Sequence, residues 1–209
     1  DMAQLPDDVA IQLQTYPIDV VIMDETDEDE VREMFLRLQN GTSLKAQEKR
    51  NAMPGQMRDF IRQLTQHSFF NSVDFKNSRF SYDHVAAQLT CLEVSGGPTN
   101  VKNADLNKMY LQNQNFAESN PTAKEVRKNL EILADTFPEK AGELQRYNVI
   151  SLYCVIAELR RQYIFDDIRP HLHDWFIDFE SQRRSQDELD EDSADPEWVS
   201  YKEKISHST

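Results

Sequence analysis

The sequence predicts a mainly α-helical protein, with a small α+β portion at its N-terminus followed by a helical bundle. Only 5 of its 209 residues are glycine and 8 are proline, which is few for the many turns of a β-sandwich. Apolar residues recur every three or four positions in most segments, the spacing of one buried helix face. The best strand candidate is a β-branched run, IDVVIM, at residues 18–23.

Residues 7–41 predict a short helix, this strand and a second helix. The first helix has Val9, Ile11 and Leu13 on its apolar side, and Pro17 ends it. A strand needs partners to form a sheet, so we expect the rest of a sheet to lie upstream of this sequence. Thr26 can cap the second helix, whose first turn is acidic. Its apolar face consists of Val31, Met34, Phe35 and Leu38, and Gly41 can end it.

Residues 43–94 predict three helices and a packed loop. Ser43 can cap a helix at about 44–52, which Pro54 and Gly55 end. The next helix has its apolar face at Met57, Phe60, Ile61 and Leu64. The aromatic stretch at 67–79 predicts a packed loop, and residues 81–94 predict a helix that ends before the Gly-Gly-Pro sequence at 96–98.

The remaining sequence predicts a bundle. A helix at 105–114 precedes the boundary at Asn120-Pro121, where Thr122 and Glu125 have the spacing of a capping box. The helix that follows has Val126, Leu130, Leu133 and Phe137 on its apolar face. The most apolar helix, at about 147–165, is expected at the centre of the bundle. Pro170 begins another helix, with Leu172, Trp175, Phe176 and Phe179 inside.

An acidic segment separates this helix from a last one. Residues 186–197 contain seven acidic and no basic residues, so we expect an exposed linker. A short helix with Trp198, Tyr201 and Ile205 follows. Because the boundary at Asn120-Pro121 precedes the bundle, we divide the chain into parts 1–118 and 119–209.

Cysteine use and hydropathy indicate a cytoplasmic protein without a membrane partner. Cys91 and Cys154 lie far apart in apolar helical segments. We expect reduced, buried thiols, with a disulfide or a metal pair as the alternative. No apolar run approaches the ~20 residues that span a bilayer. His171 and His173 point about 200° apart on a helix, so we predict no metal site there.

The charge of the chain is unevenly distributed. Its net charge is −14, whereas residues 32–62 carry seven bases and three acids, a net +4 that leaves −18 for the rest. A basic island in an acidic protein is a candidate phosphate-binding surface. The alternative is a solvated helix face with internal ion pairs.

A candidate ligand site lies within this basic island. The turn at residues 40–43 joins two helices and lies beside the N-terminus of the helix at 44–52, where free amides attract anions. Glu48 can orient an arginine toward a phosphate, or Glu48 and Arg50 can simply brace the two helices by ion pairing. The predicted phosphate or nucleic-acid ligands are Arg37, Asn40, Lys45, Glu48, Arg50 and Asn51. No catalytic residue is identified.

A second group of residues can be interpreted in two ways. Arg79, Phe80 and Tyr82 form either a surface on which a ligand stacks or part of the hydrophobic core. The core is the commoner position for large aromatic side chains.

The string FLRLQNGTSLKAQEKRNAMPG at residues 35–55 resembles the second signature of the GmrSD-type restriction endonuclease N-terminal domain, a ParB/sulfiredoxin-like family. Members carry a phenylalanine, then arginine-leucine-asparagine, a glycine, a leucine, and a glutamate followed by arginine and alanine. Gln39 replaces the asparagine here. The matching residues are Phe35, Arg37, Leu38, Gly41, Leu44, Glu48, Arg50 and Ala52.

The resemblance extends less specifically over residues 5–95, including Pro54-Gly55, the Phe69-Phe70 pair and Arg79. It implies that residues 1–118 are the C-terminal part of a GmrSD-type domain. Residues 119–209 are placed with the family by position only. The family's defining aspartate-glycine-glutamine-glutamine-arginine motif, which is tied to nucleotide binding and hydrolysis, is absent from the 209 residues, and so is its frequent C-terminal nuclease module.

The resemblance therefore implies a fragment of a prokaryotic phage-defence or restriction protein, a nucleotide-dependent nuclease that is inactive without the missing motif. It also implies DNA and a nucleoside triphosphate with magnesium as partners of the intact protein. The alternative is a non-enzymatic helical interaction module, whose acidic surface and aromatic tail bind a partner or a second copy of the chain.

Overall fold

A computed structural model describes residues 9, 11–12, 15–17, 20, 22, 27, 30–31, 34, 44–162, 165–189, 193 and 195–200. The chain divides into two compact units, residues 1–43 and 44–209. In the first unit, the described positions Val9, Ile11 and Val31 are exposed, although the sequence predicted them on apolar faces. The predicted strand at 18–23 falls mostly outside the described residues, and Val20 and Ile22 are exposed and belong to no strand.

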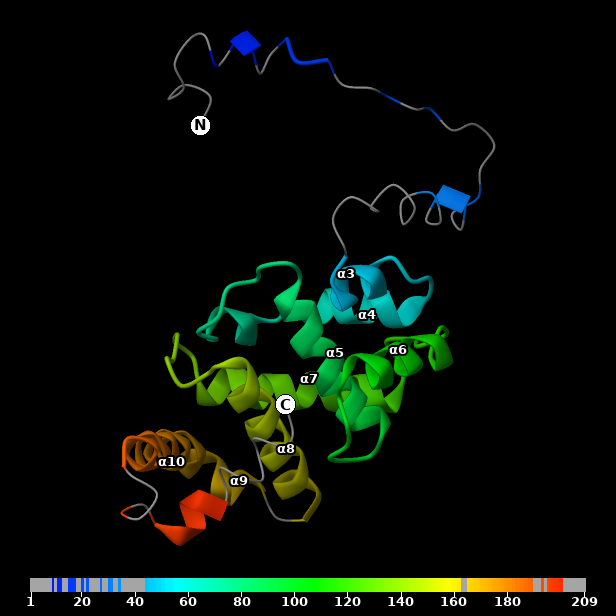
Figure 1. Ribbon diagram of the computed structural model, residues 1–209. Helices are drawn as coiled ribbons and strands as arrows, with labels where there is room; N and C mark the ends of the chain where they lie inside the picture. The colour runs from blue at the N-terminus through cyan, green and yellow to red at the C-terminus, as the bar shows by residue number, and fades with distance from the viewer. Residues whose placement is uncertain are drawn as a thin grey trace. The chain divides into compact units, whose positions relative to one another are not determined.

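The second unit is helical, which confirms the mainly α fold class (Figure 1). Nothing in the described part of the chain forms a strand. The helices are α3 (Ala46–Asn51), α4 (Gln56–Leu64), α5 (Ser81–Val94), α6 (Asn103–Gln112), α7 (Pro121–Thr136), α8 (Arg146–Gln162), α9 (Phe165–Ile168) and α10 (Leu172–Asp187), with 3-10 turns η3 (Ser68–Asn71) and η4 (Arg169–His171). Residues 196–200 are helical as well.

Helix α5 is the central element, and it packs against α3, α4, α6, α7 and α8. From Val85 to Leu92 every residue except the half-buried Gln88 is buried, so burial surrounds two full turns of the helix. Ala86 and Ala87 allow neighbouring helices to approach closely. The sequence predicted the segment at 147–165 as the central helix. Its counterpart α8 packs on α5 and α7 and keeps an exposed side.

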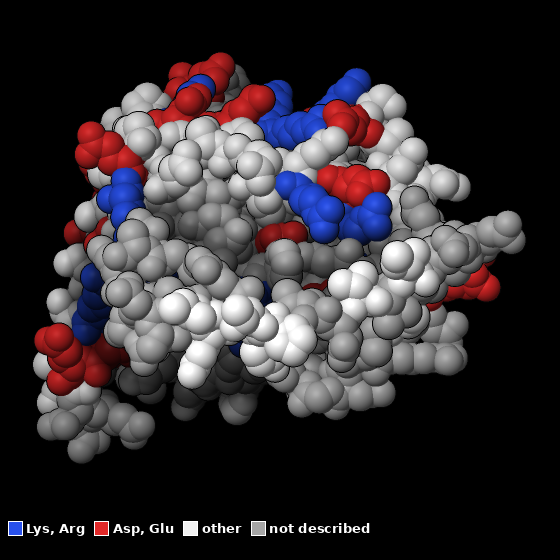
Figure 2. Space-filling model, turned by 90° about the horizontal axis from the view of Figure 1, so that it is seen from above, with Lys and Arg blue, Asp and Glu red and all other residues white. Residues whose placement is uncertain are grey.

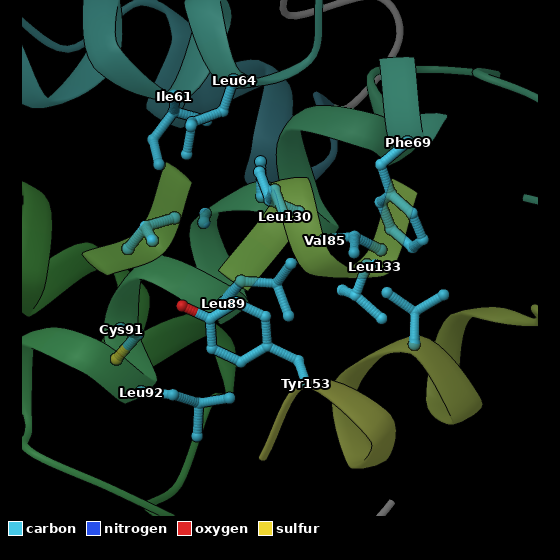
Figure 3. Close-up of a cluster of buried hydrophobic side chains, with 14 of the residues drawn as sticks. Ile61, Leu64, Phe69, Val85, Leu89, Cys91, Leu92, Leu130, Leu133 and Tyr153 are labelled. Atoms are coloured by element: carbon cyan, nitrogen blue, oxygen red, sulfur yellow. The ribbon is translucent and has the colours of Figure 1, made fainter. Parts of the chain in front are cut away.

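One hydrophobic core joins the helices on both sides of residue 118. Leu89 and Leu92 of α5 lie close to Leu130 and Leu133 of α7 and to Tyr153 of α8 (Figure 3). The two compact units divide at 43/44, and the division at residue 118 stays a prediction.

Several predicted details differ at the helix ends. Helix α3 begins after Lys45, not after Ser43, which lies outside the described residues. Asn120 caps α7, since its side-chain oxygen accepts the N–H of Thr122 at 2.9 Å. The capping box predicted for Thr122 is therefore wrong.

The last helix also differs from its prediction, because Trp175 of α10 is 47% exposed where an inward side chain was expected. Leu172 and Phe176 of the same helix are buried as expected. The predicted acidic linker starts within α10, since residues 186 and 187 are helical, and much of the remaining linker lies outside the described residues.

Gly55 fixes the start of α4 against the turn after α6. Its φ is +110°, and a Cβ there would lie 2.9 Å from both Cα and O of Gln114. The neighbouring N–H of Gln56 donates to the Gln114 carbonyl at 2.7 Å. Glycine is needed here because a side chain would be strained in this conformation and would collide with backbone. Gly96, which follows α5 with a φ of +77°, has nothing within 4 Å of a Cβ position.

We predict that Leu130→Ala lowers the free energy of unfolding by about 2–5 kcal/mol, because Leu130 is fully buried and its truncation leaves a cavity. Leu111→Ala is the matched control, since Leu111 is 59% exposed and should change stability by less than about 0.5 kcal/mol. Urea unfolding followed by circular dichroism measures both. Equal losses in the two variants would contradict the position of the core.

Candidate functional site: a buried arginine between three helices

The candidate site centres on Arg50 of α3, whose side chain has no exposed surface. Helix α3 has six residues, and the two it buries, Gln47 and Arg50, are both polar. A charged side chain is rarely this deeply buried unless other groups compensate for the lost hydration. Three helices supply those groups in this chain.

The guanidinium of Arg50 donates hydrogen bonds to four neutral acceptors. Its Nε donates to Oε1 of Gln47 at 2.9 Å, within the same helix. Its Nη1 donates to the Oδ1 atoms of Asn103 and Asn107 on α6, at 3.3 and 3.1 Å. Its Nη2 lies 2.9 Å from Nδ1 of His84 on α5. Within the described part of the chain no carboxylate forms an ion pair with Arg50, so dipoles rather than a counter-ion stabilise its charge.

Further side chains extend this network. Nε2 of Gln47 donates to Oδ1 of Asn51 at 2.8 Å and lies 3.4 Å from the hydroxyl of Tyr110 on α6. Nδ2 of Asn51 donates to Oδ1 of Asp83 on α5 at 3.2 Å. Among the described residues, every buried side-chain nitrogen and oxygen has a hydrogen-bond partner. The network is therefore complete, and it joins α3 to both α5 and α6.

Burial shifts the titration of several of these groups. It lowers the pKa of His84 to about 4, and the charges of Arg50 and Arg146 act in the same direction. His84 is therefore neutral near pH 7, and it accepts from Arg50 through Nδ1 when its proton is on Nε2. Burial also raises the pKa of Tyr110 to about 12 and raises the pKa of Asp83.

Glu48 makes a second link from α3, to the loop before α5. Nε and Nη2 of Arg79 donate to its two carboxylate oxygens at 2.8 and 2.7 Å. Glu48 also accepts the backbone N–H of Lys45 at 2.7 Å. The hydrogen bond from Arg79 is the largest cause that lowers the pKa of Glu48 to about 2. This carboxylate is ionised and fully engaged at neutral pH.

Arg79, Phe80 and Tyr82 were interpreted either as a ligand-stacking surface or as part of the hydrophobic core, and the three residues differ in this respect. Tyr82 belongs to the core side, where its ring lies 5.0 Å from that of Phe70 and its hydroxyl donates to the Phe75 carbonyl at 3.3 Å. Phe80 is 44% exposed. Arg79 and Phe80 both have positive φ, of 50° and 62°, a left-handed conformation that costs non-glycine residues free energy.

The basic residues of the island that the structure describes, within residues 44–62, do not form one continuous positive surface. Arg58 pairs with Asp59 at 2.8 Å and Arg50 is buried, whereas Lys45, Lys49 and Arg62 are exposed. Figure 2 shows basic and acidic side chains next to each other on the face that it presents.

The structure brings together part of the predicted ligand set. Arg37 and Asn40 lie outside the described residues. Arg50 and Asn51 belong to the buried network, Glu48 pairs with Arg79, and Lys45 is exposed. An enclosed guanidinium cannot contact a ligand in this conformation. Arg50 braces α3 against α5 and α6 through neutral acceptors, whereas Glu48 pairs with Arg79, so the ion pairing predicted for Glu48 and Arg50 is replaced by these contacts.

Sequence reasoning missed His84, Asn103, Asn107 and Tyr110, the partners of Arg50 and Gln47 on α5 and α6. The spacing of Asn103 and Asn107 was an available signal. Residues four apart share one helix face, and two amides on the face that also carries buried residues indicate a polar partner there.

A surface pocket lies apart from this network. It has a volume of about 290 Å³ and is lined by Asp135, Thr136, Asp166, Arg169, Pro170 and His173. Arg169 pairs with Asp135, and His173 pairs with Asp174 at 3.0 Å. No group of three histidine, cysteine, aspartate or glutamate residues in the described part of the chain could hold a metal ion.

Comparisons of the chain with protein-family models, curated proteins and solved structures found no match. The resemblance to the GmrSD-type domain stays a prediction. None of the helices in the described ranges is long and apolar enough to cross a membrane.

We predict that stability falls as pH drops from about 6.5 to about 4 and that His84 causes part of this fall. The unfolded state takes up the proton near the usual pKa of 6.5, whereas the folded state resists it down to about 4, so the contribution is complete above about 6.5. His84→Asn keeps an acceptor near the Nδ1 position and removes the titration. Free energies of unfolding from urea titrations at several pH values should show a flatter pH dependence in His84→Asn.

His171→Asn is the control for this experiment, because His171 is exposed. It should keep the pH dependence of the wild type. The opposing contribution of Asp83, whose pKa is raised, is common to all three proteins and cancels in the comparison. Identical slopes for wild type and His84→Asn would contradict the assignment.

Proposed function

We propose that this chain is a helical supporting part of a prokaryotic, defence-type, nucleotide-dependent DNA-processing protein of the GmrSD kind. The support from the sequence is the signature-like string at residues 35–55. Nucleotide hydrolysis would then require the family's aspartate-glycine-glutamine-glutamine-arginine motif, which the 209 residues do not contain. On this proposal the chain alone has no catalytic activity.

One observation supports this role: Glu48 and Arg50, the two residues best suited to catalysis or ligand binding, both bond to other residues of the chain. Glu48 is held by Arg79 and by the N–H of Lys45. Arg50 donates to acceptors on three helices and has no exposed surface. Side chains engaged in this way fix the position of α3, and neither Glu48 nor Arg50 is free to act as an acid, a base or a ligand in this conformation.

Any direct phosphate contact from the described part of the basic island would come from its exposed members. Lys45 lies just before α3 and Lys49 lies on its exposed side. Both are flexible ammonium groups that contact phosphate as point charges. Binding through them would be weak, independent of sequence and sensitive to salt.

We predict that the chain hydrolyses no nucleoside triphosphate above the buffer rate and that it binds duplex DNA only weakly. Lys45→Ala/Lys49→Ala should reduce this binding and leave the melting temperature unchanged.

Arg50→Met should lower stability by about 1–3 kcal/mol, because the buried Gln47 and the half-buried His84 and Asn107 lose their donor. Phosphate release, fluorescence anisotropy of labelled DNA and thermal melting measure the three quantities.

Two outcomes would contradict this assignment. Hydrolysis by the chain, lost in Glu48→Gln at unchanged melting temperature, would make Glu48 a catalytic residue. Loss of DNA binding in Arg50→Met without a loss of stability would make Arg50 a ligand residue.

A second candidate function is a protein-interaction module, which the aromatic residues near the end of the described chain favour. Trp175 of α10 is 47% exposed and stacks on Phe179, with ring centroids 5.7 Å apart. Phe179 lies 5.1 Å from Trp198 of the following helix. Exposed tryptophan is typical of binding surfaces because it buries a large apolar area.

For this second candidate we predict a homodimer that Trp175→Ala weakens at least tenfold. Leu111→Ala is the matched control, because it removes another exposed apolar side chain, on α6. Light scattering over a range of protein concentrations distinguishes the variants. A monomer at every concentration, or equal weakening by both substitutions, would exclude self-association through Trp175.

A further inference from the structure

We propose that α3 is a latch, a helix that undocks from α5 and α6 as one unit while the rest of the bundle stays folded. This inference goes beyond the proposed function, since it concerns how the chain moves. It depends on what α3 buries, on the contacts that its opening would break, and on where the chain is held next to it.

Helix α3 contacts the bundle through polar side chains, whereas the neighbouring helix α4 contacts it through apolar ones. Helix α4 buries four apolar side chains, those of Met57, Phe60, Ile61 and Leu64. Each such side chain contributes about 1.5–3 kcal/mol on burial. Helix α3 buries only Gln47 and Arg50, so its docking depends on hydrogen bonds, whose net contributions are smaller.

Water can replace most of what α3 loses on opening. Arg50 regains the hydration that burial denies it, and the amides of Asn103 and Asn107 can bond to water instead. The pair of Glu48 and Arg79 already lies at the surface, with side chains 15% and 40% exposed. Opening therefore exposes groups that water solvates well, and segments of this kind open at lower free energy than an apolar core.

The contacts of α3 are arranged so that they break together. Arg50 reaches α5 and α6 through three acceptors, His84, Asn103 and Asn107, whereas Gln47 and Asn51 each add one contact to these helices. If the guanidinium withdraws, the bonds from Gln47 and Asn51 lose the position of the helix that aligns them. A single node with several partners favours an all-or-none release.

The chain is fixed directly after α3. Gly55 is packed against the backbone of Gln114, and the N–H of Gln56 donates to the Gln114 carbonyl. Met53 and Pro54 form the connection between this anchor and α3, and the half-buried side chain of Met53, which packs against the core, is the one apolar contact of this connection that opening would loosen. On the other side, α3 begins two residues after the division between the compact units at 43/44. The helix can therefore turn about residues 53–54 without displacing α4.

The latch would give Arg50 two roles at different times. In the docked state its charge is enclosed and braces three helices. In the undocked state the same guanidinium reaches solvent, next to Lys45 and Lys49. The sequence allowed Arg50 to be either a brace or a phosphate ligand. These two interpretations would then describe the docked and the undocked state of α3.

Hydrogen exchange of the whole chain, read by mass spectrometry or NMR, tests the proposal. The reporting amides are those of Lys49, Ala52 and Met53, which donate to backbone carbonyls of residues 45–50. In the wild type they should exchange at least tenfold faster than the buried amides of α5. Arg50→Met should accelerate them a further tenfold or more and leave α5 and α8 unchanged.

Two further variants keep the test decisive. Arg79→Met removes the surface pair with Glu48 and leaves the hydrogen bonds of Arg50 to α5 and α6 in place, so it should accelerate α3 less than Arg50→Met does. Leu130→Ala weakens the core, so it should accelerate α5, α7 and α3 together. The proposal is overturned if α3 exchanges as slowly as α5 in the wild type, or if Arg50→Met accelerates both helices equally.

Discussion

Burial of α5 on every side is the constraint on which the rest of the second unit depends. A helix enclosed for two turns needs neighbours around its whole circumference, and α3, α4, α6, α7 and α8 provide them. Four of these neighbours bury apolar side chains in return. Helix α3 does not, so the last part of the α5 surface is closed by the polar network around Arg50.

That polar closure has a physical cost and a physical benefit. A buried guanidinium loses hydration, and neutral acceptors recover only part of it. The geometry they impose is, however, specific, because a planar group with fixed N–H directions accepts few arrangements of partners. The network therefore defines how α3 sits on α5 and α6 more strictly than apolar contacts of equal strength would.

Apolar spacing predicted most of the helices, and α5 matches its predicted bounds of 81–94. The same method placed the wrong helix at the centre. It placed the 147–165 segment at the centre because that segment is the most apolar, whereas Ala86 and Ala87 of α5 permit the close approach that a central helix needs. Trp175 was predicted inside together with Leu172 and Phe176, and apolar spacing does not tell how much of a helix circumference its neighbours cover.

The candidate site was less predictable than the fold. The sequence indicated that residues 35–55 were important and left open whether Glu48 and Arg50 bind or brace. Charge predicts exposure for an arginine, so the burial of Arg50 was not expected. Its partners His84 and Asn107 are 34 and 57 residues away in the sequence, and nothing in the local pattern around Arg50 points to them. Their proximity follows from the packing of α5 and α6.

The surroundings of Gly55 and Gly96 indicate where the chain of the second unit can accept inserted residues. At Gly55 the chain lies against the backbone of Gln114, so the α4 start and the turn after α6 form one junction. An insertion in that turn would displace α4 and the hinge of α3 with it. The loop around Gly96 has open space instead, and extra residues there would extend into solvent. Homologous chains of different length should therefore vary between α5 and α6 and keep a constant number of residues between α6 and α7.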